Sequence, residues 1–502
     1  MSPPLARQSV STEIITDGRN TLKLSLTRRV RSGLGWNTSS TLIAQIIGFA
    51  RSIIIARLLA PEDVGLFGMA LAVHLGLNAL TTLGLDHTIL ARQFESDDEF
   101  RAQLNTVWST ELLRSLLLAL LVLASAYPMS RFFNQPTLVK LIMVLALVAA
   151  VEGFQNIGLT ILRKQISFVR LFWFDLLVSA GSTVLIIVIA FATRSVWTLI
   201  LGQLIAAMFG TSLSYFFHPY RPRFVFEKVA FRRILTFSKF AVVIAVSSYV
   251  TTMVDNVVVG RLLGTGALGN YALAYGLASF PIGVMIFALG RVTLPAFAEL
   301  SASYPDRIEH AFTQLFSISS LGLVTIAVPL FLLADELVLL LFGEKWISAA
   351  PVLRVLSLII PLRGLTLVVG SLFFGLNRPK PVATGKALEA VVFLLLILPL
   401  TKAFGLTGAA WAGVITYAFA LANRFYMAGG LIPGLPAKLV RVSLATLGAS
   451  AVGLLAAALI LRFLESLIPR LFFGGLLAAT IPALLLLLTR SDLRKWIVEA
   501  AT

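Results

Sequence analysis

The feature that most constrains this sequence is a succession of long apolar runs, which begins near residue 33 and continues almost to the end of the chain. A typical run has about 20 residues, the length of a helix that crosses the hydrocarbon core of a bilayer. Apolar residues make up 58% of the 502 residues and charged residues only 13%, about half the share found in soluble domains. The sequence therefore predicts an all-α integral membrane protein.

We expect about fourteen transmembrane helices, separated by short polar segments or by Pro and Gly. Basic residues gather in alternate loops, and the positive-inside rule assigns these loops to the cytosolic side. This orientation places both termini in the cytosol. This bias accounts for most of the net charge of +17, so nucleic acid is not an expected partner. The predicted spans are 33–58, 65–90, 104–127, 137–162, 171–193, 195–217, 233–259, 267–292, 312–334, 349–375, 384–401, 405–428, 439–461 and 471–489.

The sequence lacks the residues and motifs that several classes of protein chemistry require. The chain has no cysteine, and its four histidines fall in no ligand spacing, so we expect no metal site. Motifs for nucleotide binding and for serine hydrolases are also absent, and we expect no cofactor. The longest predicted loops, near 218–232 and 293–312, are too short for a catalytic domain. The prediction is a transporter rather than an enzyme.

An internal repeat organises the spans. Residues 56–70, at the end of the first span, resemble residues 260–274, at the end of the seventh, at an offset of 204 residues. The two segments align without a gap. They share Arg-Leu-Leu, a Gly eight positions after the Arg, and a later Ala. A repeat six spans later in the same orientation predicts two pseudo-symmetric six-helix lobes, related by an axis along the membrane normal, plus two C-terminal helices.

The same segments resemble a known family. Gly48-Phe49-Ala50-Arg51 followed by the stretch 56–65 is similar to the first-span signature of Wzx-type polysaccharide transporters, in the multidrug/oligosaccharidyl-lipid/polysaccharide exporter superfamily. Segments 32–36, 254–256, 269–271 and 405–410 are similar to that family's patterns as well. The resemblance implies a flippase that moves undecaprenyl-pyrophosphate-linked oligosaccharide from the cytosolic to the outer leaflet of a bacterial inner membrane. Its partners would be this lipid-linked oligosaccharide, membrane lipids and other polysaccharide assembly proteins.

Spans and repeat together predict the domain boundaries. The predicted parts are a cytosolic basic tail (1–31), an N-lobe (32–218), a cytosolic linker (219–232), a C-lobe (233–428), a helical hairpin (429–489) and a cytosolic C-terminal tail (490–502).

Charged residues within the spans are the candidates for binding cargo, because a pyrophosphate cannot cross hydrocarbon without compensating charge. Arginine suits this role since its guanidinium stays protonated and forks onto phosphate oxygens. Arg51 and Arg363, both well inside predicted spans, are the strongest candidates. Arg57 and Arg261 are also candidates, but they lie at span ends, where interfacial anchoring is sufficient explanation.

Other intramembrane charges have different predicted roles. Glu152, in the middle of the fourth predicted span, belongs either to a satisfied polar cluster or to a proton relay. Lys386 and Glu389 are three residues apart on one helix and are expected to neutralise each other. Arg424, near a cytosolic helix end, is expected to extend to the interface.

The repeat offset pairs two of these positions. Adding 204 to Arg51 gives Asp255, so equivalent sites in the two lobes carry opposite charges. These side chains are expected either to form a cross-lobe ion pair when the cleft closes on its outer side, or to be satisfied by polar neighbours within their own lobes.

Two other functions remain open at this stage. An ion-coupled exporter of drugs or other small molecules would share the fold, but its cavity would favour acidic and aromatic residues. An integral-membrane polysaccharide polymerase or ligase is disfavoured by the lack of a long outer loop.

Overall fold

In the computed structural model, the described part of the chain comprises residues 43–85, 96–165, 167–303, 307–376, 380–461 and 469–489, with a few single positions between them. Its regular structure is helical, without a strand. The predicted tails 1–31 and 490–502 and the first ten residues of the first predicted span lie outside the described residues.

A helix over 43–58 comes first. The elements that follow are α2 (Pro61–Thr81), α4 (Asp97–Phe133), α5 (Leu138–Glu152), α6 (Gly158–Lys164), α7 (Phe168–Thr193), α8 (Trp197–Phe217), α9 (Lys228–Ser303), α10 (Ile308–Leu332), α11 (Ala334–Phe342), the 3-10 helix η2 (Glu344–Ala349), α12 (Ala350–Ser357), α13 (Ile359–Gly375), α14 (Lys380–Gly429), α15 (Leu435–Leu461), the π-helical turn η3 (Arg470–Gly474) and α17 (Gly475–Thr489).

Nine helices among the described residues are long and apolar enough to cross a membrane. Two of the nine lie in segments of α9 and α14 that contain a break, at Gly264 and Gly405, where the backbone leaves the helical region at positive φ. Gly264 lies in the gap between two predicted spans and Gly405 is the first residue of a predicted span, so each of these elements corresponds to two predicted spans. The chain is a multi-pass membrane protein, and the total of fourteen spans stays a prediction.

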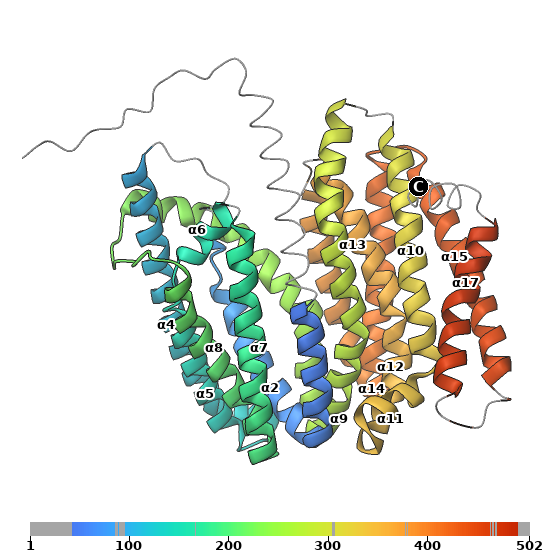
Figure 1. Cartoon of the computed structure of the whole chain (residues 1–502), viewed down its shortest axis with the longest axis horizontal. Helices are drawn as coiled ribbons and strands as arrows, with labels where there is room; N and C mark the ends of the chain where they lie inside the picture. Colours follow the sequence, from blue (N-terminus) through green and yellow to red (C-terminus); the bar gives the residue numbers. More distant parts are fainter. Residues whose placement is uncertain are drawn as a thin grey trace, which may run out of the picture.

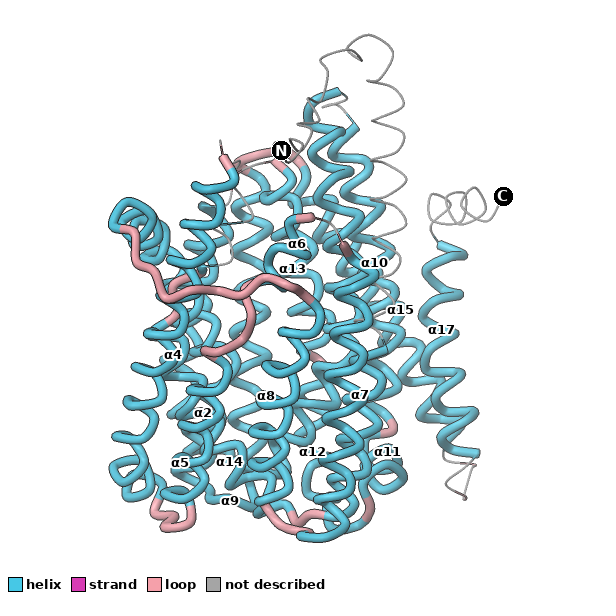
Figure 2. Tube along the Cα trace, turned by 60° about the vertical axis from the view of Figure 1, so that its left-hand side comes forward, coloured by secondary structure: helices cyan, strands magenta, loops and turns pink. Residues whose placement is uncertain are grey.

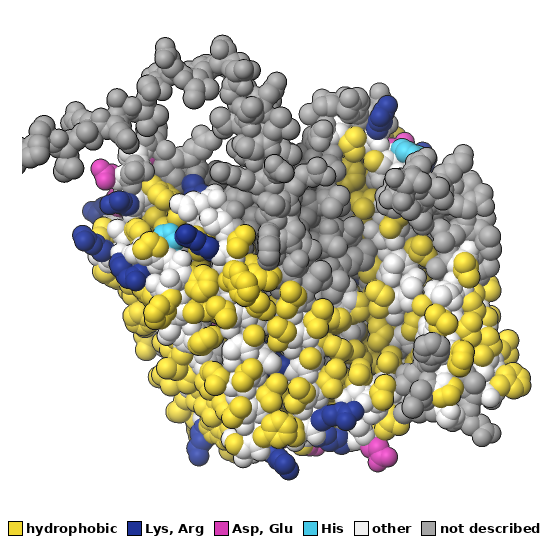
Figure 3. Space-filling model, in the orientation of Figure 1, with side chains coloured by type: hydrophobic (Ala, Val, Ile, Leu, Met, Phe, Trp, Pro, Cys, Tyr) yellow, Lys and Arg dark blue, Asp and Glu magenta, His cyan; other side chains and the backbone are white. Residues whose placement is uncertain are grey.

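The helices form two groups that separate toward the top of Figure 1, which is the predicted cytosolic side. One group, the N-lobe, contains the first helix, α2 and α4 to α8; the other, the C-lobe, contains α9 to α14. α15 and α17 pack against each other and against α10, at the outer flank of the C-lobe. On the face drawn in Figure 3, a broad hydrophobic belt separates Lys and Arg side chains at its upper and lower edges.

Two predicted boundaries differ from the structure. The fourth predicted span, 137–162, is interrupted: α5 ends at Glu152, and after a turn α6 begins at Gly158. The predicted loop 293–312 is largely helical, because α9 continues to Ser303. The extension of α9 continues beyond the apolar residues that mark the predicted span, because helix propensity does not depend on hydrophobicity.

The connection between the lobes, residues 218–227, is bonded to α4 along one helix face. The backbone N–H groups of Arg223, Val225 and Glu227 donate to the side-chain oxygens of Asn105, Ser109 and Thr106, at 3.0 to 3.2 Å. Figure 2 shows a loop crossing the front of the helices in this way. The linker is therefore attached to the N-lobe, and α9 begins the C-lobe.

Candidate functional site: an interlobe cavity and its seal

The two lobes meet at their lower ends in Figure 1, the predicted outer side, through a reciprocal contact between repeat-related residues. A Cβ added to Gly65 would lie 1.8 Å from the carbonyl oxygen of Thr265, and one added to Gly269 would lie 1.9 Å from that of Pro61. Thr265 and Gly269 are the 204-residue equivalents of Pro61 and Gly65. Only glycine permits this approach, and its reciprocity is what a two-fold relation between lobes requires.

The last turn of the first helix is bonded to the C-lobe beside this contact. Lys345 Nζ donates to the carbonyl oxygens of Arg57 (2.9 Å) and Leu59 (2.6 Å), and Trp346 Nε1 donates to that of Ala56 (2.8 Å). A helix leaves its last carbonyls without intrahelical partners and favours a cation near them. The C-lobe thus caps a helix of the N-lobe, and we call these contacts the outer seal.

Arg57 provides the opposite half of the seal. Its Nε donates to the carbonyl oxygen of Leu341 at 2.9 Å and its Nη2 to that of Leu340, in the last turn of α11. Its repeat equivalent, Arg261, lies over the ring of Phe132 in the N-lobe at 5.7 Å. Both arginines contact the other lobe near the outer end, and neither lines a cavity described below.

Lys345→Met removes the ammonium that joins the two lobes while keeping an unbranched side chain. We expect the outer seal to loosen, and labelling of a Ser279→Cys reporter in the interlobe cavity by a membrane-impermeant maleimide applied from outside to accelerate about threefold. The chain has no native cysteine, so the reporter is the one thiol. Lys402→Met, at an exposed position of α14, is the control and should label at the wild-type rate.

A cavity of 830 Å³ lies between the lobes, which we call the interlobe cavity. Its walls come from the first helix, α2, α7 and α8 on one side and from α9 and the end of α11 on the other. Among the described residues, Arg51 is the one charged residue that lines it. Its volume is in the range of ligand-binding sites. Other lining residues include Gln45, Phe49, Ser52, Phe67, Gln203, Asn256, Ser279, Phe280 and Phe342.

The structure does not join Arg51 to Asp255. Asp255 is 2% exposed, and its Oδ2 accepts a hydrogen bond from the hydroxyl of Tyr271 at 2.8 Å, within the C-lobe. Its Oδ1 accepts from the backbone N–H of Asn256 at 2.9 Å. The hydrogen bonds of Asp255 are therefore made within its own lobe, which was the alternative to a cross-lobe ion pair.

Arg363 lies in a different cavity from Arg51. It lines a space of 500 Å³ inside the C-lobe, bounded by α9, α13 and α14, which we call the C-lobe cavity. Its Nη1 donates to the hydroxyl of Tyr275 at 3.1 Å, and Tyr275 stacks on Tyr271 with ring centroids 6.2 Å apart. Arg363 and Asp255 are therefore each hydrogen-bonded to one of two stacked tyrosines, Tyr275 and Tyr271.

Lys386 and Glu389 form the expected ion pair, with Nζ and Oε2 3.0 Å apart. The expectation for Arg424 was wrong. Its side chain is buried, donating to the carbonyl oxygens of Pro381 (2.7 Å) and Val382 (3.1 Å) and pairing with Glu389 at 3.4 Å. Because α14 is kinked, Arg424 contacts Glu389, which lies 35 residues earlier in the chain. The position of a residue along a predicted span does not reveal such a contact.

Glu152 is exposed at the last residue of α5, rather than mid-span as expected. The charges of Arg114 and Glu111 act on its carboxyl. Arg114 was not singled out from the sequence; it pairs with Glu111 and donates to the Asn78 side chain at 2.9 Å. The i, i+3 spacing of Glu111 and Arg114 is the sequence feature from which this ion pair could have been predicted.

The comparisons with known proteins agree with this architecture. Residues 54–351, more than half of the chain, match the family model described as polysaccharide biosynthesis protein. The succinoglycan biosynthesis transport protein ExoT of Rhizobium meliloti is 25% identical over 334 residues, 66% of each chain. The lipopolysaccharide biosynthesis protein WzxC of Escherichia coli is 26% identical over 358 residues, 71% of this chain and 72% of that one.

Solved transporter structures share the fold. The lipid II flippase MurJ in an inward closed conformation matches 91% of this chain and 99% of its own, with a TM-score of 0.74 and 16% identity. An inward-facing multidrug resistance transporter of the same superfamily matches 78% of this chain and 95% of its own, with a TM-score of 0.63 and 17% identity. The chain therefore belongs to the polysaccharide biosynthesis protein family, the Wzx-type polysaccharide transporters of the multidrug/oligosaccharidyl-lipid/polysaccharide exporter superfamily.

Proposed function

We propose that the protein flips undecaprenyl-pyrophosphate-linked oligosaccharide from the cytosolic to the outer leaflet of a bacterial inner membrane, for lipopolysaccharide, capsule or exopolysaccharide synthesis. The observation that carries the proposal is Arg51, whose side chain lines the 830 Å³ cavity between the lobes. The names of the relatives, a polysaccharide transport protein and a lipopolysaccharide biosynthesis protein, support the cargo class.

The chemistry of the interlobe cavity suits a lipid pyrophosphate. No carboxylate is among the described residues that line the site, so the guanidinium is available to phosphate oxygens, and its planar fork can bind two of them. Gln45, Gln203, Asn256 and Ser279 add neutral donors and acceptors for sugar hydroxyls. The polyprenyl tail would stay in the bilayer, so only the head group needs this cavity.

Transport would proceed by alternating access. With the outer seal formed, cargo would enter from the cytosolic side, and its binding would favour the state in which the seal opens. A ligand shifts such an equilibrium only through a difference in affinity between the two states. Arg51, on the same helix whose last turn forms the seal, provides a physical connection between cargo and seal.

The energy source stays a prediction. Because the sequence has no nucleotide-binding motif, transport would depend on an ion gradient or on consumption of the cargo after it is flipped. Glu152, the last residue of α5, is the acid proposed as a proton relay, and the charges of Arg114 and Glu111 act on its carboxyl.

A second candidate, an exporter of small molecules, is favoured by one observation. Phe49, Phe67, Phe280 and Phe342 give the interlobe cavity an aromatic character suited to apolar drugs. A cationic drug would lack a counter-charge there, because no carboxylate is among the lining residues of the described chain.

Deletion of the gene separates these functions. A flippase deletion should accumulate undecaprenyl-pyrophosphate-linked oligosaccharide in the inner leaflet, detected by mass spectrometry and by its inaccessibility to a glycan-binding probe applied to spheroplasts. Complementation with the wild-type gene should clear it. Accumulation in the outer leaflet would indicate a polymerase or ligase, and drug hypersensitivity without accumulated lipid would indicate an exporter.

A further inference from the structure

The C-lobe cavity is separate from the interlobe cavity and differs from it in charge. Three cationic side chains line it, Arg363, Lys386 and Arg424, together with one carboxylate, Glu389. Lys386 and Arg424 both pair with that carboxylate, at 3.0 and 3.4 Å. Arg363 forms no ion pair with a carboxylate among the described residues, and its hydrogen-bond partner is the neutral hydroxyl of Tyr275. The cavity therefore holds an excess of positive charge.

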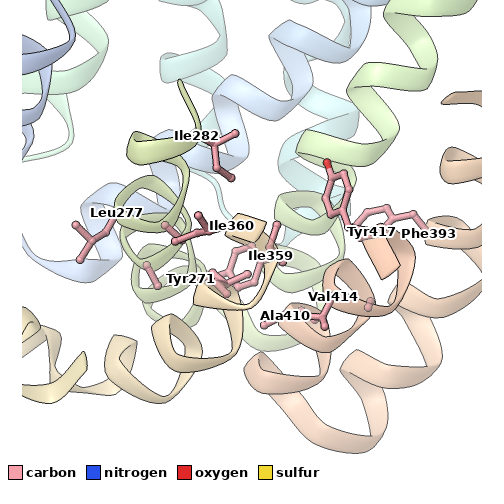
Figure 4. Packing of buried hydrophobic residues seen from close by; sticks show 14 of the residues in the cluster. Tyr271, Leu277, Ile282, Ile359, Ile360, Phe393, Ala410, Val414 and Tyr417 are labelled. Atoms are coloured by element: carbon pink, nitrogen blue, oxygen red, sulfur yellow. The ribbon is translucent and has the colours of Figure 1, made fainter. Parts of the chain in front are cut away.

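Two buried polar side chains at this cavity have unused hydrogen-bonding capacity. Nε of Arg424, in a residue only 3% exposed, has no hydrogen-bond partner among the described residues, and the hydroxyl of Tyr417, in a residue 4% exposed, lies near the side chain of Thr251. Figure 4 shows the Tyr417 hydroxyl directed away from the neighbouring Phe393. A buried polar group without a partner costs about 1–3 kcal/mol, so a ligand that accepts a hydrogen bond from Arg424 Nε would be favoured here.

The rings and cations of the cavity are arranged around Tyr417. The Arg363 guanidinium carbon and Lys386 Nζ lie 5.7 and 5.9 Å from the Tyr417 ring centroid. Two cations and a tyrosine hydroxyl thus converge on one space from α13 and from both halves of α14. Convergent positive donors of this kind are the usual recognition element for a carboxylate or a phosphate group.

We propose that the C-lobe cavity is a binding site for an oxyanion, a carboxylate or phosphate group on a molecule of at most sugar size, held by Arg363, Lys386 and Tyr417. The volume of 500 Å³ accommodates such a group and limits its size. Ile244 and Phe374, which also line the cavity, are each 50% exposed, so it reaches the surface of the C-lobe. The site is independent of the cargo site proposed at Arg51.

Thermal unfolding of the purified full-length protein in detergent tests this site without measuring transport. The ligands are inorganic phosphate, glucuronate and glucose, at constant ionic strength set with chloride. The protein carries Arg51→Gln, which removes the cation of the interlobe cavity. We expect phosphate or glucuronate at 10 mM, but not glucose, to raise the Tm by about 2 °C or more, because a ligand that binds only the folded state stabilises it.

Added Arg363→Gln should abolish the Tm shift. Tyr417→Phe removes only the hydroxyl, preserves packing and should weaken the fitted affinity several-fold, which keeps the test valid if the Arg363 variant is unstable. A shift with glucuronate alone would identify an acidic sugar as the source of the group, and a shift with phosphate alone a phosphate. No shift with either oxyanion, or equal shifts with and without Arg363, would overturn the proposal.

Discussion

Arg51→Ala is expected to reduce polysaccharide export by at least about tenfold while leaving the amount of protein in the membrane within about twofold of wild type. Arg51 is the one charged residue in the described part of the chain that lines the interlobe cavity, so its loss removes charge-assisted bonds to a pyrophosphate. Losing about 1.4 kcal/mol of such interaction lowers affinity tenfold. Packing should change little, since the side chain borders open space rather than the core.

Two variants sharpen this prediction. Arg51→Lys keeps the charge but not the planar fork and should restore export only in part. Arg194→Ala changes an exposed arginine at the C-terminal end of α7 that does not line the cavity, and this variant should export normally. Export is measured as surface polysaccharide, alongside membrane abundance by immunoblot. Full export by the Arg51→Ala variant would show that Arg51 is not required for transport.

The sequence allowed the helical fold and much of its internal organisation to be predicted, because hydropathy and glycine spacing are local properties. The match between residues 56–70 and 260–274 predicted a two-fold arrangement, and the reciprocal contacts of Gly65 and Gly269 are those of such an arrangement. The kinks at Gly264 and Gly405 also lie where the apolar pattern was interrupted.

The side-chain networks were less accessible to sequence reasoning. Arg51 and Arg363 were grouped as one site because both lie inside spans, yet they line different cavities. Depth along a helix gives no information about rotation around its axis, and rotation decides which cavity a side chain meets. Trp346 and Lys345 were not singled out from the sequence, because their role in the outer seal depends on partners some 290 residues earlier in the chain.

Glycine to alanine substitutions at the reciprocal contact test whether the two lobes separate there when the outer side opens. A Cβ at Gly65 or Gly269 would overlap a backbone carbonyl of the other lobe, at 1.8 or 1.9 Å. Alanine favours a helix more than glycine does, by about 1 kcal/mol, so each helix should tolerate the change and the clash is relieved by separating the lobes. The expected result is a population shifted toward an outer-open state.

The Ser279→Cys reporter measures this shift. In right-side-out vesicles, Gly65→Ala and Gly269→Ala should each raise the rate of labelling from outside by at least about tenfold, which corresponds to a shift of about 1.4 kcal/mol in the equilibrium. Export should fall in the same variants, because a transporter held open on one side cannot reload. Gly448→Ala, at a glycine of α15 with open space around the added Cβ, is the matched control and should leave labelling and export unchanged. If both interlobe glycine variants label as slowly as wild type, the lobes do not separate at this contact, and the outer seal would have to open elsewhere.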